Sequence, residues 1–169
     1  MEENNLRTPV WYVCYGSNLL WSRFERYIIG GKCEENGKEY DGCTDKTLPL
    51  KNVAVEIPYE LYFAKQSSYW DGMGVAFLNT EKPGKTQGRA YLVNKGQLED
   101  IQTQEGPAWY DVIFNLGTID GIPAVTLTSS VRYEENVPSK KYLDTIKRGL
   151  KDLEELEMKE LENCRLSAI

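Results

Sequence analysis

The chain has 169 residues, of which 41% are apolar and 27% charged, and this composition matches one soluble globular domain rather than a multidomain or disordered protein. A formal net charge of −6 argues against nucleic acid or an anionic membrane as the main partner, because neither would be attracted. The sequence contains no histidine, which excludes Ser-His-Asp and Cys-His catalysis and imidazole ligation of zinc. We therefore expect a small-molecule ligand, with any acid or base work done by a carboxylate, Lys, Tyr or Cys.

The N-terminal third predicts a strand, a helix and a long excursion. Residues 1–8 are polar and are expected to be flexible. The aromatic and β-branched run at 10–15 predicts a buried strand, which a Gly-Ser-Asn turn stops. Apolar residues at helical spacing predict a short helix at 19–29. Residues 30–50 lack periodicity and are rich in Gly and charged side chains, so we expect a long surface excursion there.

The rest of the chain predicts short strands and two helices. In chain order, the expected elements are two strand pieces around Pro58 within 53–63, strands at 74–79 and 88–94, a helix at 95–104, an antiparallel pair at 110–116 and 122–127, and an amphipathic helix at 140–164. Many short strands with few helices, without strict alternation, indicate an α+β fold. No linker or repeat divides the chain, so residues 1–169 are expected to form a single domain.

The four cysteines do not form a metal-binding pattern. Cys14, Cys33, Cys43 and Cys164 contain no CxxC pair, so a structural zinc site is not expected. No apolar run reaches the roughly 20 residues that span a bilayer, and the polar N-terminus does not resemble a signal peptide. We expect a cytoplasmic protein with free thiols, and a Cys33–Cys43 disulfide is the lesser alternative.

Two positions are candidates for a binding or catalytic role. The turn Gly16-Ser17-Asn18 stands between a strand and a helix, where backbone N–H groups and the helix dipole suit a carboxylate. From spacing alone, Ser17 or Asn18 is better explained as a helix cap, although the two roles can coexist. Glu105 ends a short helix before Gly106, but it is one of 26 acidic residues and by itself would be taken for a surface charge.

Four segments in order give a more specific indication. They are residues 12–19 (YVCYGSNL), 70–76 (WDGMGVA), 88–91 (GRAY) and 104–106 (QEG), the last with Tyr110 shortly after. In sequence and approximate spacing, the chain resembles the γ-glutamylcyclotransferase-like superfamily over about residues 10–150.

This resemblance implies a fold, a reaction and a set of site residues. The fold would be a small mixed, largely antiparallel β-barrel flanked by helices. The reaction would be the intramolecular aminolysis of a γ-glutamyl amine or peptide to 5-oxoproline, of acyltransferase or lyase type, without metal or cofactor, in a monomer or homodimer. Glu105 would be the general acid/base, and the pocket residues would be Tyr12, Tyr15, Gly16, Ser17, Asn18, Leu19, Trp70, Gly72 and Tyr110.

Glu105 needs a raised pKa for this role, and Trp70, Tyr91 and Trp109 are candidates for the apolar surroundings that would raise it. The chain also departs from the family pattern. Met73 stands where glycine is frequent, and Thr126 is the nearest match to a tyrosine in the strand around 125–129. Residues 30–50 are longer than in compact members and could cover the pocket as a lid.

Three alternatives stay open at this level. The fold could serve as a non-catalytic module that binds an amino acid derivative. Glu105 favours the enzyme, because a module that only binds a carboxylate gains nothing from an additional buried acid. Cys14 could be a nucleophile, although a packed thiol is the ordinary reading without a histidine partner. The helix at 140–164 could bind a partner or a second copy instead of covering the barrel, which burial of Leu156, Met158 and Leu161 would decide.

Overall fold

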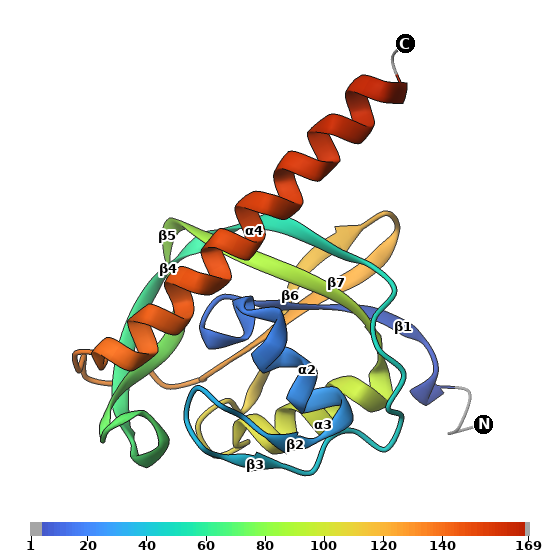
Figure 1. The fold of residues 1–169 in the computed structure, drawn as a ribbon. Coiled ribbons are helices and arrows are strands. Elements are labelled where there is room, and N and C mark those ends of the chain that lie inside the picture. The colour runs from blue at the N-terminus through green and yellow to red at the C-terminus, as the bar shows by residue number, and fades with distance from the viewer. Residues whose placement is uncertain (1–4, 168–169) are drawn as a thin grey trace.

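The computed structural model describes residues 5–167, and within the last helix it describes side chains up to Glu160 and that of Glu162. The centre of the fold is a five-stranded sheet in the order β4-β5-β1-β7-β6, with helices packed beside it (Figure 1). Its strands are β1 (Pro9–Cys14), β4 (Asn52–Ser67), β5 (Met73–Asn94), β6 (Val112–Ile119) and β7 (Ile122–Thr128). A separate small pair joins β2 (Gly31–Lys32) to β3 (Glu39–Tyr40).

Strand β1 lies at the centre of the sheet, where the sequence predicts a buried strand. It pairs antiparallel with β5 and parallel with β7, and residues 10–14 are all buried. The β6–β7 hairpin is antiparallel as predicted, and its turn is Asp120-Gly121, both with positive φ. Asp-Gly is a sequence typical of two-residue hairpin turns, because both residues tolerate that conformation.

The strands β4 and β5 form one long hairpin of 16 and 22 residues, where the sequence predicts separate short pieces. Register shifts at Ile57/Tyr59 and Tyr59/Glu60 absorb Pro58, which has no N–H to donate. Opposite this irregularity, a Cβ on Gly84 would come within 2.9 Å of Glu60 Cα, so only glycine allows the two chains to approach. The ladder therefore continues through positions that interrupt the local sequence pattern.

The expected barrel is not closed, although the α+β class is correct. The sheet has two open edges, β4 and β6, within the described residues. The first half of β5 extends past the end of β1 and lies beside β7, where side chains replace a ladder. Thr128 Oγ1 donates to Leu78 O at 3.0 Å and accepts from Leu78 N at 3.2 Å. One hydroxyl group thus satisfies two backbone groups that a closed barrel would pair between strands.

Three helices pack beside the sheet: α2 (Trp21–Ile29), α3 (Lys95–Glu105) and α4 (Lys140–Ser167). Helix α2 begins later than predicted, because the 3-10 turn η1 (Ser17–Leu19) precedes it. Helix α3 follows the prediction and begins at a capping box, in which Asn94 Oδ1 accepts from Gln97 N at 2.8 Å.

The first half of α4 covers the body of the molecule, and its second half extends beyond it (Figure 1). At Gly149, a Cβ would come within 2.5 Å of Leu19 Cβ, which shows how closely the helix lies on η1. Leu153 is buried and Leu156 half-buried, whereas Met158 is 60% exposed. Leu161, the third position expected to decide between covering and partner binding, lies outside the described side chains. Among the described residues, no helix is long and apolar enough to cross a membrane.

Residues 30–50 are packed against the body rather than forming a plain surface excursion. They contain β2 and β3, and Tyr40 of β3 is buried against Tyr27 of α2. Cys43 N donates to Ile28 O at 2.9 Å, which anchors the segment to the end of α2. Cys33 and Cys43 are buried free thiols, as is Cys14, so the alternative disulfide is absent; Cys164 lies outside the described side chains.

The bridge at Thr128 gives a stability test. Thr128→Val removes the hydroxyl and leaves two buried backbone groups of Leu78 unpaired, which should lower the free energy of unfolding by about 2–4 kcal/mol. Thr118→Val, on the exposed face of β6, is the matched control and should change it by less than about 0.5 kcal/mol. Equilibrium urea unfolding measures both values, and equal losses in the two variants would refute the role of this bridge.

Candidate functional site

The end of β1 leads into a tight turn that is pressed against β5 and α4. A Cβ on Gly16 would lie 2.8 Å from Tyr142 Oη and 3.2 Å from Ala76 Cβ, so no larger residue fits without movement. The turn continues into η1, whose Ser17 and Asn18 are both buried. Tyr91 Oη donates to Asn18 O at 3.0 Å and so fixes the backbone of the turn.

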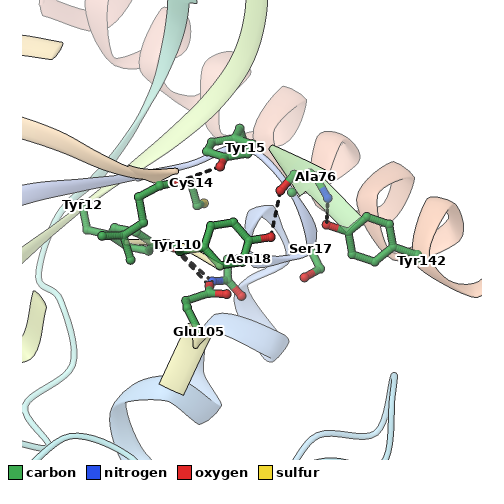
Figure 2. Close-up of a pocket in the computed structure, with 11 residues that line it drawn as sticks. Tyr12, Cys14, Tyr15, Ser17, Asn18, Ala76, Glu105, Tyr110 and Tyr142 are labelled. Atoms are coloured by element: carbon green, nitrogen blue, oxygen red, sulfur yellow. Dashed lines mark hydrogen bonds between the residues drawn. The ribbon is translucent and has the colours of Figure 1, made fainter. Parts of the chain in front are cut away.

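Glu105 ends α3 and meets this turn through one short hydrogen bond. Asn18 Nδ2 donates to Glu105 Oε1 at 2.6 Å, and it also lies 3.2 Å from Tyr12 Oη (Figure 2). Tyr12 Oη lies 3.4 Å from the same carboxylate oxygen. Nothing in the sequence around Glu105 predicts its burial, but the fold brings residues 87 positions apart into direct contact.

The surroundings of Glu105 raise the pKa of its carboxyl group. Burial raises its pKa above the ordinary value of 4.5, and this effect outweighs the charges of Arg23 and Lys38 and the hydrogen bond from Asn18, which all lower it. A raised pKa brings a carboxyl group closer to the range that general acid/base catalysis requires.

Tyrosine hydroxyl groups surround the same space and are tied to backbone groups. Tyr15 Oη donates to Leu127 O at 2.7 Å, and Tyr110 Oη donates to Ala76 O at 2.8 Å. Tyr142 Oη accepts from Ala76 N at 3.0 Å (Figure 2). Burial raises the pKa of Tyr15 and Tyr110 well above 10 and that of Tyr142 to about 12, so all three stay neutral.

Cys14 also borders this space, but its environment does not favour a nucleophile. Burial raises the pKa of its thiol well above the ordinary value of 9.0, and Sγ donates to Arg89 O at 3.4 Å. A thiol held protonated and hydrogen-bonded has little thiolate available. Within the described residues, no group of three or more Cys, Asp, Glu or His side chains could hold a metal ion.

The site consists of two adjoining pockets. The first is lined by Tyr12, Cys14, Tyr15, Gly16, Ser17, Asn18, Ala76, Glu105, Tyr110, Leu127 and Tyr142. The second shares four of these residues, Ser17, Glu105, Tyr110 and Tyr142, and adds Trp70 and Trp109 among others. Eight of the ten sequence-predicted site residues therefore border one or both pockets.

The other two predicted site residues line neither pocket. Leu19 is 1% exposed and packs under α4 at Gly149, so it supports the turn from behind. Gly72 has a φ of +70° in the turn before β5, where its role is conformational. Tyr91, expected near Glu105, instead stacks on Phe24 at 4.0 Å between ring centroids. Thr126 is fully buried and donates to Val13 O at 2.6 Å, also away from the pockets.

Sequence reasoning missed Arg23, Lys38 and Tyr142. Arg23 is 4% exposed, and its Nε donates to Ser17 Oγ at 2.7 Å. The signal for Arg23 was present, because it occupies the apolar face of α2 beside Phe24 and one turn before Tyr27. Lys38 approaches the site through the fold of residues 30–50, where its Nζ donates to Gln104 O at 3.2 Å.

Comparison with known proteins shows the fold and one distant sequence relative. No family model matches the sequence. The chain is 27% identical over 186 aligned positions to histone deacetylase 5 of Arabidopsis thaliana, covering 85% of this chain but only 28% of that protein. The chain thus spans less than a third of the length of this relative.

Solved structures are similar over most of the chain. A gamma-glutamyl cyclotransferase superposes with a TM-score of 0.62 at 21% identity, over 89% of this chain and 85% of the other. An uncharacterised protein from Homo sapiens gives 0.62 at 24%, with the same coverage. YkqA from Bacillus subtilis gives 0.55 at 19%, over 85% of this chain and 48% of its own. At these identities, the likeness establishes that the chain has the gamma-glutamyl cyclotransferase fold.

The raised pKa of Glu105 predicts how stability depends on pH. The folded state binds this proton more tightly than the unfolded chain, so the contribution is complete below the unfolded pKa of about 4.3 and is lost as the pH rises through the folded value. Glu105→Gln resembles the protonated form at every pH. The free energy of unfolding of the variant minus that of the wild type should therefore increase between about pH 4 and pH 8.

Urea unfolding across this pH range measures the difference. Glu99→Gln, an exposed position on the same helix, is the control and should give a difference that is nearly independent of pH. A Glu105→Gln difference that stays flat or decreases with pH would contradict the desolvated carboxyl group.

Proposed function

We propose that this chain is a γ-glutamyl cyclotransferase-type enzyme, which cyclises the γ-glutamyl unit of its substrate to 5-oxoproline and releases the attached amine. One observation carries the proposal: a partly buried carboxyl group with a raised pKa, Glu105, lies in hydrogen-bond contact with Asn18 at a pocket wall. The likeness of the fold to a gamma-glutamyl cyclotransferase supports the same reaction.

The first pocket offers groups for a zwitterionic γ-glutamyl head. Asn18 Oδ1 is buried without a hydrogen-bond partner, beside the Glu105 carboxylate, and these two acceptors suit an α-ammonium group. The backbone of residues 16–18, which also lines the pocket, would receive the α-carboxylate. A substrate held this way is folded so that its own amine approaches its γ-carbonyl, which is a large part of the catalytic advantage.

Glu105 would move the protons that the reaction transfers. The Glu105 carboxylate takes one proton from the α-ammonium group, the freed amine nitrogen forms a bond to the γ-glutamyl carbonyl carbon, and negative charge develops on the carbonyl oxygen. Glu105 gives this proton to the departing nitrogen as the amide bond breaks, then takes the second proton from the ring nitrogen and passes it to the released amine. The products are 5-oxoproline and the amine in its ammonium form, so the enzyme ends in its starting state without a metal or cofactor.

Neutral hydroxyl groups around the pocket complete this arrangement. Ser17 Oγ already accepts from Arg23 Nε at 2.7 Å, so its own proton is directed away from Arg23. Ser17 lines both pockets, and its hydroxyl group would donate to the oxygen on which negative charge develops.

Mass-spectrometric detection of 5-oxoproline across γ-glutamyl amino acids, γ-glutamyl amines and glutathione tests the proposal. Glu105→Gln should lower kcat by about 10²–10⁴-fold on any substrate that is turned over, because it cannot accept a proton. Glu99→Gln, one and a half turns away on the exposed face of α3, should retain wild-type turnover. Near-normal activity of Glu105→Gln would refute the assignment, and thermal stabilisation by these compounds without any product would favour a binding module.

A further inference from the structure

The second pocket has the opposite electrostatic character from the first. Its charged lining residues are two cations, Arg23 and Lys38, and one acid, Glu105, which it shares with the first pocket. The remaining lining is largely aromatic, with tyrosine and tryptophan side chains from five separate segments. A γ-glutamyl unit seated in the first pocket with its carbonyl at Glu105 would direct its leaving amine toward this space.

Arg23 is a buried cation whose partners carry no charge. It donates to Ser17 Oγ, to Tyr40 Oη at 2.8 Å and to Tyr27 Oη at 3.2 Å. Its guanidinium carbon also lies 5.3–5.4 Å from the ring centroids of Tyr27, Tyr40 and Trp70. Across the described part of the chain, no carboxylate oxygen comes within the 4.0 Å of an ion pair with Arg23.

Burying the Arg23 guanidinium among uncharged partners costs free energy unless an anion pairs with it. A buried charge without a counterion loses its hydration and is normally found paired. Arg23 donates to Cys33 Sγ, and Cys33 in turn donates to the Glu35 carboxylate. Glu35, however, forms its ion pair with Arg148 at 3.6 Å. The pocket therefore has positive charge that the protein's own acids leave uncompensated.

Lys38 and Asn36 add two further donors from the turn between β2 and β3. Lys38 Nζ is held against Gln104 O and lies 4.9 and 5.0 Å from the ring centroids of Tyr40 and Tyr69. Asn36 Oδ1 accepts from Lys38 N at 3.0 Å, which fixes the orientation of the amide. Its Nδ2 is then a buried donor without any hydrogen-bond partner.

Each pocket has one buried polar atom without a hydrogen-bond partner, and the two atoms suit ligand groups of opposite charge. In the first pocket, the unpartnered atom is an acceptor, Asn18 Oδ1, and in the second it is a donor, Asn36 Nδ2. Buried donors without partners are rare in native proteins, and a ligand that supplies the missing acceptor removes their cost. With Glu105 ionised, the two cations leave one positive charge, which a single carboxylate on the ligand would balance.

We propose that the second pocket binds a carboxylate carried by the leaving amine, so that the substrate is a γ-glutamyl amino acid or peptide rather than a γ-glutamyl derivative of a neutral or cationic amine. Lys38 and Asn36 donate to this carboxylate, and Arg23 supplies charge from behind. This inference rests on the proposed cyclotransferase reaction and adds the class of leaving group to it.

Three substrates that differ at one group test the inference. They are γ-glutamyl-alanine, its carboxamide γ-glutamyl-alaninamide, and γ-glutamyl-ethylamine, in which hydrogen replaces the carboxylate. Charge-assisted hydrogen bonds predict a kcat/KM for γ-glutamyl-alanine about 10- to 100-fold above that of either analogue. Calorimetric binding of the same compounds to Glu105→Gln gives the preference independently of turnover.

Variants assign the preference to the second pocket. Lys38→Met should reduce the ratio of γ-glutamyl-alanine to γ-glutamyl-alaninamide by about tenfold. Asn36→Asp keeps the acceptor for Lys38 N but replaces the free donor with an anion, so it should reduce this ratio at least as far. Lys85→Met, at an exposed position on β5, is the matched control and should leave both rates and their ratio unchanged.

The outcomes separate the two proposals. Equal rates and equal affinities for the three compounds, or a ratio that Lys38→Met and Asn36→Asp leave unchanged, would overturn the carboxylate subsite while leaving the cyclotransferase proposal standing. Absence of 5-oxoproline from every compound would refute the cyclotransferase proposal. In that case, binding to Glu105→Gln without preference for γ-glutamyl-alanine would also overturn the subsite, and a clear preference would support it.

Discussion

The hydrogen bond from Asn18 to the Glu105 carboxylate is the contact on which the site depends, because it joins the turn after β1 to the last residue of α3. Both partners are held in place by further hydrogen bonds. Tyr91 fixes the backbone of Asn18, and Lys38 donates to the carbonyl group of Gln104, directly before Glu105. The geometry around the carboxyl group is therefore set by the packing of the sheet, α3 and the segment at 30–50.

The proposed reaction needs an acid/base group and an anion site, which a protein with no histidine and a net charge of −6 has to create locally. Desolvation raises the pKa of Glu105, while the charges of Arg23 and Lys38 lower it. The same two cations would give the second pocket its preference for a carboxylate. One pair of charges thus adjusts the proton transfer and, in our proposal, selects the leaving group.

Local patterns predicted the parts of the fold that depend on neighbouring residues. Strand β1 and helices α3 and α4 follow the apolar spacing of their own segments, and the YGSN turn lies where the sequence indicates. The continuous β4–β5 hairpin was not predictable in this way, because bulges absorb Pro58 and keep the ladder intact. Lys38 was out of reach, since its place depends on a contact with Gln104, 66 residues away. Arg23 was within reach, as a cation on an apolar helical face.

The central claim is that Glu105 is a desolvated carboxyl group with a raised pKa, and its own titration tests this most directly. Carbon-13 NMR of protein labelled at glutamate side-chain carboxyl groups, with Glu105→Gln to assign the signal, measures its pKa in the free protein. The account predicts a pKa above the ordinary 4.5, which rises further in Arg23→Met or Lys38→Met as a lowering charge is removed. A Glu105 carboxyl group that titrates at or below 4.5 would contradict the account.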